Sequence, residues 1–209
     1  MPIDDGIVFD LARIQGERIK EDAEYEGVRM RVSASLDGAR VSMQIDVGFG
    51  DLVDPPPAEI TFPVLLPLDA PVLRAYPPEA VIAEKFHAMV VLGIANSRMK
   101  DFFDVWTLAQ THRFDFEVLG GSIRGTFERR RTSLPEGVPM ALTSEFLEDR
   151  SKQTQWAAFG RRLGLNDLPP LPLVGDQIAE LLMPVLFDGR PADSPSRTWA
   201  PGGPSTGGT

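Results

Sequence analysis

The first part of the chain alternates hydrophobic and polar positions with a period of two, which is typical of β-strands that bury one face. Every second residue is apolar over residues 28–36, and residues 41–47 repeat the pattern. Between the two runs stands Asp37-Gly38, a dipeptide that favours a two-residue hairpin turn. We therefore expect an antiparallel hairpin, preceded by shorter strands near residues 7–9 and 18–20.

Residues 52–76 form a connector rich in proline, and proline inside a helix both removes a donor and clashes, so no long helix is expected there. After Pro77-Pro78 the apolar positions recur every three or four residues, which indicates amphipathic helices. The first predicted helix ends at Gly93, and the second is capped by Asn96 or Ser97. Three more are predicted over residues 116–128, 144–163 and 175–187.

This order of strands followed by helices predicts an α+β fold, with a small, mostly antiparallel sheet followed by a helical bundle. The predicted divisions are a sheet subdomain with its connector over residues 1–76 and a helical subdomain over residues 77–188. Residues 189–209 are rich in Pro, Gly, Ser and Thr. They are expected to form a disordered tail that can be removed without loss of stability.

Composition excludes several classes of function. The chain has 209 residues, no cysteine and two histidines, which excludes disulfide frameworks, thiolate metal sites and multi-histidine metal sites. Its net charge of −9 argues against a strongly basic nucleic-acid-binding domain but allows a local basic patch. The run Arg129-Arg130-Arg131 is expected to be solvated; the alternative is that it offsets the C-terminal dipole of the preceding helix or contacts phosphate. No apolar run reaches the roughly 18 residues needed to span a bilayer and no signal peptide is visible, so we expect no membrane association and a cytoplasmic location.

Two single residues could carry chemistry. Asp46 is expected on a strand, on the face opposite its apolar neighbours, where a rigid carboxylate could hold a metal ion. The alternative is a solvated aspartate. Lys85 lies midway between Val81 and Met89 at spacings of four, at the edge of an apolar stripe. It either extends past the core into solvent or points into a polar cleft.

A third segment opens the second predicted helix. Asp101 and Asp104 share one helix face at a spacing of three, and the loop before this helix is short, so the two helices must be neighbours. The functional interpretation is a cleft wall in which Asp101 faces Lys85, with Arg98 and Lys100 nearby to bind anions. The alternative is an exposed helix surface with weak local ion pairs, such as Lys100 with Asp104.

The run from Tyr76 to Ala109 resembles the nucleotidyltransferase AbiEii/AbiGii toxin family, the toxin half of a bacterial toxin–antitoxin system. In that family a proline-led helix carries Ala-Glu-Lys and the next helix carries Lys-Asp-x-x-Asp. The matching segments are Ala83-Glu84-Lys85 and Lys100-Asp101-Phe102-Phe103-Asp104. The segment QIDVGFGD, residues 44–51, also resembles the stretch where the family places a strand aspartate. The resemblance covers roughly residues 8–159.

This resemblance implies a partial polymerase-β-like nucleotidyltransferase sheet followed by a helical domain. The implied reaction transfers a nucleotide from an NTP to an RNA, such as a tRNA, or to another acceptor. A cognate antitoxin protein is an implied partner. Asp46 would be the catalytic strand carboxylate and a Mg²⁺ ligand. Lys85, with Arg98 and Lys100, would bind the triphosphate, and Asp101 would position Lys85 or assist the acceptor.

The sequence departs from the family at its beginning. The Gly-Gly or Gly-Ser turn and the Asp-x-Asp pair that supply the main metal ligands do not occur before Asp46. We therefore expect that this chain lacks the first strands and helix of the family and binds Mg²⁺ weakly by itself. The alternative function is a non-catalytic remnant that binds a protein or RNA partner, and a third is a plain helical interaction domain.

Overall fold

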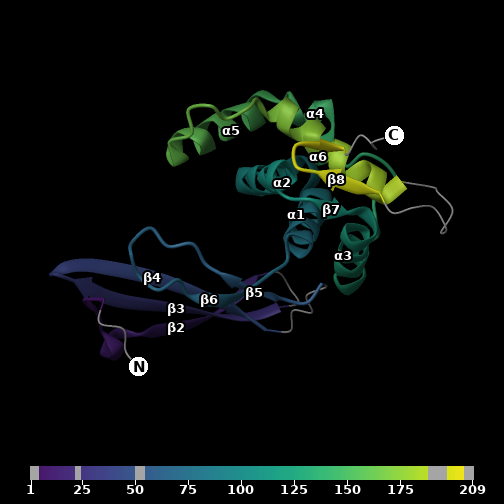
Figure 1. Cartoon of the computed structure of the whole chain (residues 1–209). Helices are drawn as coiled ribbons and strands as arrows, with labels where there is room; N and C mark the ends of the chain where they lie inside the picture. Colours follow the sequence, from purple (N-terminus) through teal and green to yellow (C-terminus); the bar gives the residue numbers. More distant parts are fainter. Residues whose placement is uncertain (1–4, 22–24, 50–54, 188–196, 205–209) are drawn as a thin grey trace. The chain divides into compact units, whose positions relative to one another are not determined.

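The structure is a computed structural model and describes residues 5–21, 25–49, 55–187 and 197–204 (Figure 1). Helices and small antiparallel sheets make up these residues, so the predicted α+β class is confirmed. The chain divides into two compact units, residues 1–52 and 53–209. The proline-rich connector thus falls with the helices, whereas the predicted division at residue 76 groups it with the sheet.

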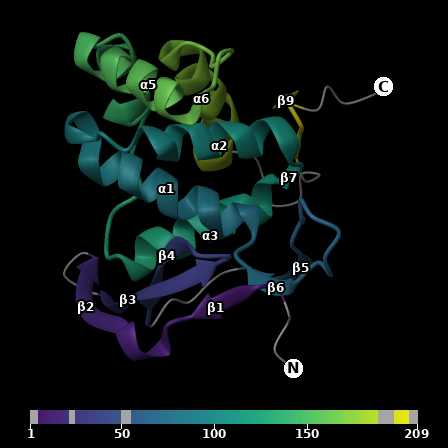
Figure 2. The same cartoon turned by 90° about the vertical axis from the view of Figure 1, so that its left-hand side faces the viewer.

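The first unit is a four-stranded antiparallel sheet built around one long central strand (Figure 2). The central strand is β3 (Tyr25–Leu36); β4 (Ala39–Gly48) pairs along its whole length. On the other edge, β2 (Gln15–Glu21) and β1 (Ile7–Phe9) pair with successive parts of β3. Both residues of the Asp37-Gly38 turn have positive φ, 46° and 80°, as a tight hairpin of this type requires.

The pairing register separates the two faces of this sheet. Met30 lies opposite Ile45 on the apolar face, whereas Arg29 lies opposite Asp46 on the polar face. The alternation predicted from the sequence is therefore correct, and it fixes Arg29 and Asp46 as cross-strand neighbours.

The second unit begins with the hairpin β5 (Ala58–Thr61) and β6 (Val72–Ala75), and six α-helices follow among the described residues. Their bounds are α1 (Pro78–Leu92), α2 (Met99–Thr111), α3 (Phe116–Arg129), α4 (Ser144–Leu147), α5 (Arg150–Leu163) and α6 (Leu171–Phe187). The single helix predicted over residues 144–163 is in fact two. The first ends at Leu147, and Asp149 caps the second, because its carboxylate accepts hydrogen bonds from the backbone N–H groups of Ser151 and Lys152.

The helices enclose one aromatic-rich core. The rings of Phe102 on α2 and Phe146 on α4 stack with centroids 5.4 Å apart, and Phe86 on α1 lies 5.9 Å from Phe127 on α3. All four side chains are essentially inaccessible to solvent. Burial of this kind holds α1, α2 and α3 at fixed positions relative to one another, which is the condition for a defined site between α1 and α2.

The C-terminal segment differs from its prediction. The strand β8 (Thr198–Ala200) pairs with β7 (Phe114–Asp115), and β9 (Gly203–Pro204) pairs with β8. Trp199 is 1% exposed, and its indole N–H donates a 2.7 Å hydrogen bond to the carbonyl oxygen of Ala109 near the end of α2. The predicted disordered tail is therefore wrong for residues 197–204, because Trp199 supplies enough apolar surface to anchor them. The rest of the tail lies outside the described residues.

No helix in the described parts of the chain is long and apolar enough to cross a membrane. The cytoplasmic location stays a prediction.

Candidate functional site

Lys85 on α1 faces α2, where it contacts two carboxylates. Its Nζ lies 2.9 Å from Oδ1 of Asp101 and 2.7 Å from Oδ2 of Asp104. The spacing of three between the aspartates places both on the side of α2 that faces α1. The side chain of Lys85 is 18% exposed and that of Asp101 is 4% exposed. The predicted pairing of Lys85 with Asp101 is therefore present, and the pair is mostly buried.

The carboxylates keep Lys85 charged despite its burial. Burial by itself lowers the pKa of Lys85, but hydrogen bonds to Asp104 and Asp101 and their negative charges outweigh it, so the pKa is raised above its ordinary value. Burial by itself raises the pKa of Asp104. The hydrogen bonds from Lys100 and Lys85 and their positive charges outweigh burial, so the pKa of Asp104 is lowered below its ordinary value. Each group thus stabilises the charged form of the other across the neutral pH range.

Two more cations complete this group. Arg98 and Lys100 lie at the start of α2, with side chains 61% and 71% exposed. Lys100 pairs with Asp104. Arg98 Nε lies 2.8 Å from Oδ2 of Asp101 but is not aligned for a hydrogen bond, so this contact is an ion pair and the buried Oδ2 accepts no hydrogen bond within the described structure. We call Lys85, Arg98, Lys100, Asp101 and Asp104 the Lys85 centre.

A buried lysine that the sequence pattern did not single out supports the loop before α2. Lys152 on α5 is 7% exposed, and its Nζ donates a 2.7 Å hydrogen bond to the carbonyl oxygen of Asn96. Asn96 is itself fully buried and accepts the backbone N–H of Arg98 through its side-chain oxygen at 2.8 Å. The sequence signal was available: Lys152 precedes Trp156 by four residues and so falls on the apolar side of α5.

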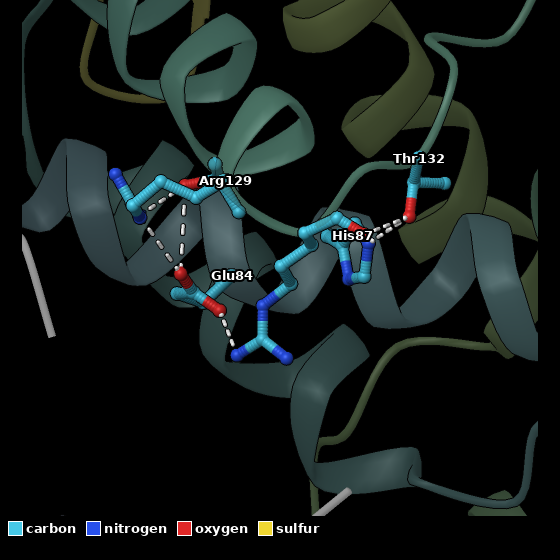
Figure 3. Close-up of polar contacts among 6 residues, drawn as sticks. Glu84, His87, Arg129 and Thr132 are labelled. Atoms are coloured by element: carbon cyan, nitrogen blue, oxygen red, sulfur yellow. Dashed lines mark hydrogen bonds and ion pairs between the residues drawn. The ribbon is translucent and has the colours of Figure 1, made fainter. Parts of the chain in front are cut away.

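The residue before Lys85 connects α1 to a different helix (Figure 3). The carboxylate of Glu84 lies 3.2 Å from Arg129 Nη2 and 2.7 Å from Arg130 Nη2, at the end of α3. Three residues further on, His87 is buried, and its Nε2 lies 3.0 Å from the hydroxyl of Thr132. The prediction that the arginine run is solvated is therefore wrong for Arg129 and Arg130. The adjacent residues Glu84 and Lys85 tie α1 to α3 and to α2 respectively.

Asp46 belongs to the other unit, where Arg29 occupies its carboxylate. Arg29 donates from Nε to Oδ1 at 2.8 Å and from Nη2 to Oδ2 at 2.9 Å, and Gln44 donates to Oδ2 at 3.2 Å. The hydrogen bond from Arg29 is the main cause that lowers the pKa of Asp46, with the charges of Arg29 and Arg31 adding to it. These contacts hold Asp46 ionised, with one guanidinium and one amide as its hydrogen-bond partners.

The described residues do not fit the Mg²⁺ site that the resemblance implies. Mg²⁺ needs several oxygen ligands in octahedral geometry. Both oxygens of Asp46 already accept hydrogen bonds, and the described part of the chain contains no group of three or more acidic or histidine side chains able to hold a metal ion.

Asp46→Asn is therefore expected to leave Mg²⁺ binding unchanged, because the carboxylate is bonded to a guanidinium rather than open to a cation. Calorimetric titration of the chain and the variant with Mg²⁺ measures this, with Asp37→Asn in the hairpin turn as a control for loss of one exposed carboxylate. A substantially weaker Mg²⁺ affinity in Asp46→Asn alone would restore the predicted ligand role.

Comparisons with known proteins place these motifs in one family. The sequence model of the family described as "Nucleotidyl transferase AbiEii toxin, Type IV TA system" matches residues 2–180. The matched span contains the strand of Asp46 and both helical motifs of the Lys85 centre. No curated protein and no solved structure gives a significant match to the chain.

Proposed function

The chain belongs to the AbiEii family of nucleotidyl transferase toxins of type IV toxin–antitoxin systems, and from this premise we propose that the Lys85 centre binds the phosphates of a nucleoside triphosphate whose nucleotide is transferred to an RNA. Membership of a toxin–antitoxin family also implies a cognate antitoxin.

The observation that carries the proposal is the state of the Lys85 ammonium. An ammonium has three N–H donors, and Asp101 and Asp104 take two of them. One donor has no acceptor among the residues that the structure describes, and the side chain keeps 18% of its surface exposed. A lysine with only a structural role is expected to be either fully paired or extended into solvent. The partly paired, partly exposed ammonium of Lys85 therefore favours a role in binding an anion.

The charges of the centre suit a phosphate ligand. Lys85, Arg98 and Lys100 provide three positive charges against the two carboxylates, and Arg98 and Lys100 are exposed. Arginine and lysine are the usual side-chain partners of phosphate oxygens. Asp101 and Asp104 serve as positioning residues, because they fix Lys85 in one place and keep it protonated.

The proposed reaction is a displacement at the α-phosphorus. A hydroxyl oxygen of the RNA forms a bond to the α-phosphorus, the bond between that phosphorus and the oxygen bridging to the β-phosphorus breaks, and pyrophosphate leaves with that oxygen. The proton of the hydroxyl passes to water. Negative charge builds up on the leaving pyrophosphate, so a fixed cation such as Lys85 stabilises the transition state more than the ground state.

Lys85→Gln is expected to weaken NTP binding about tenfold to a hundredfold. The reason is that the substitution removes one charged hydrogen bond to phosphate, which contributes about 1.5–3 kcal/mol to binding. Calorimetry with each of the four NTPs measures it, at a temperature where circular dichroism shows both proteins folded. The matched control is Arg129→Gln, which also removes an ion pair of α1 but on the side facing α3. Equal NTP affinities for Lys85→Gln and the unaltered chain would refute the assignment.

Transfer is tested separately with an α-labelled NTP and total RNA, by following label that becomes acid-precipitable. Label in RNA with the unaltered chain and none with Lys85→Gln supports the transferase proposal. Lys85-dependent NTP binding without transfer would overturn it for this chain and leave the second candidate, a nucleotide-binding module without catalysis. The engaged carboxylate of Asp46 is the observation that favours this second candidate.

A further inference from the structure

We infer that the solvent-facing side of α5 binds the phosphate backbone of the RNA acceptor beside the Lys85 centre. This inference rests on the proposed function and extends it, since it names the surface on which the acceptor lies.

The charge of α5 is the first reason. Its sequence contains three arginines and one lysine but no aspartate or glutamate, in a chain whose net charge is −9. A chain with this net charge repels a polyanion over most of its surface. A helix whose charged residues are all positive is a local exception that can attract and orient a polyanion. Neutralisation of phosphates by such side chains is the main source of affinity for nucleic acids.

The arginines of α5 are spaced along one side of the helix. Arg150 and Arg161 are eleven residues apart, about three turns, so they point in nearly the same direction and lie about 16 Å apart along the axis. Both are exposed, and so is Arg162, which follows directly. Between them the exposed positions include Thr154 and Ala157, whose small side chains let a phosphate backbone approach the helix closely.

These arginines are available to a ligand. Arg150 and Arg161 form no ion pair with any described residue, whereas Arg29, Arg129 and Arg130 are all engaged by carboxylates. Asp149, which directly precedes Arg150, directs one carboxylate oxygen, Oδ1, to the first backbone N–H groups of α5. Arg162 additionally lies over the ring of Phe159, with 5.9 Å to its centroid, which orients its guanidinium without neutralising it.

A path of contacts connects the first turn of α5, on its buried side, to the Lys85 centre. The first turn of α5 holds Lys152, which is bonded to Asn96, and Asn96 is bonded to the backbone of Arg98. α5 contacts α2 and follows α4 at the edge of the helical unit (Figure 1). Arg150, at the first turn of α5, is therefore the arginine of this surface that lies nearest in the chain of contacts to Arg98, and in the proposed arrangement the RNA runs from Arg161 past Arg150 with its terminal hydroxyl directed to the bound NTP.

The test uses the full chain and a fluorescein-labelled RNA stem–loop, with binding followed by anisotropy over a range of salt concentrations. The triple variant Arg150→Ala, Arg161→Ala, Arg162→Ala is expected to bind at least tenfold more weakly. The slope of log affinity against log salt should fall by about 2–3, close to one unit for each phosphate that is no longer neutralised. The matched control replaces three exposed arginines on other elements, Arg40, Arg74 and Arg124, by alanine and so makes the same change in net charge.

Three outcomes would overturn the inference: no RNA binding by the unaltered chain, an unchanged slope in the α5 triple variant, or an equal loss in the control. NTP affinity of the α5 triple variant should equal that of the unaltered chain. Lys85→Gln should show the converse, weaker NTP binding with normal RNA binding, so failure of the NTP site and failure of the RNA surface give different results.

Discussion

Trp199→Ala is expected to lower the free energy of unfolding of the helical unit by about 3–5 kcal/mol, the usual cost of truncating a fully buried tryptophan. Trp199 is 1% exposed and belongs to the main core cluster. The substitution also removes the indole N–H that donates to the carbonyl oxygen of Ala109. That oxygen keeps one partner, the backbone N–H of Gly202 at 3.0 Å, so the main loss is apolar packing.

Removal of the segment should have an effect at least as large. A chain ending at residue 196 loses β8 and β9 together with the hydrogen bond from the N–H of Phe116 to the carbonyl oxygen of Arg197, at 3.0 Å. A chain ending at residue 204 keeps all of these interactions and is the matched control. Helical circular dichroism during urea denaturation reports the helical unit, because all the described α-helices belong to it.

A change below about 1 kcal/mol in Trp199→Ala, or equal stability of the two truncated chains, would show that residues 197–204 do not anchor the core and would restore the prediction of a dispensable tail.

Lys85→Met is the second substitution with a large expected effect, a loss of about 2–3 kcal/mol in unfolding free energy. Methionine keeps the aliphatic length of the side chain but removes the charge. Asp101, whose side chain is 4% exposed, is then left beside Arg98 alone without a single aligned hydrogen bond to its carboxylate. A buried carboxylate that loses its hydrogen-bonded cation retains its desolvation cost without compensation.

The double variant Lys85→Met, Asp101→Leu should recover most of that loss. It removes both buried charges together, and apolar residues of similar volume in place of a buried pair are often neutral or stabilising. Asp104 keeps Lys100 as its partner in both variants. A double-mutant cycle measured by urea denaturation gives the coupling energy. If the two substitutions were additive, with no recovery, the ion pair would not be the source of the destabilisation.

Local rules were enough to predict several elements from the sequence. The period of two and the Asp-Gly turn predicted the β3–β4 hairpin, and the register that follows from them makes Arg29 and Asp46 neighbours. Asp101 was expected to face Lys85 because the loop between the two predicted helices, Gly93–Ser97, is short. Such contacts depend on residues close in sequence, and their geometry is set by strand pleat, helix period and loop length.

Long-range contacts decided what the sequence pattern could not. The hairpin register makes Arg29 and Asp46 neighbours, but only the side-chain geometry shows that the guanidinium occupies both oxygens of a carboxylate that resembled a metal ligand. Glu84 likewise meets Arg129 and Arg130 only because α3 packs against α1. The charge of a side chain is known from the sequence, but its partner is chosen by packing.

By itself the sequence determined the α+β class, the hairpin and the two helices that carry the family motifs, because these follow from periodicity and short connections. Only the tertiary structure decided that the side chains of Trp199 and Lys152 are buried. Trp199 lies in a segment that was expected to be disordered and Lys152 on a predicted helix with no partner assigned to it, and each bonds to a carbonyl oxygen far away in the sequence, at Ala109 and Asn96. A segment rich in polar or small residues tends to stay in solvent. That tendency is outweighed where a large side chain buries its apolar surface against the core, or where a charged side chain finds a hydrogen-bond partner there.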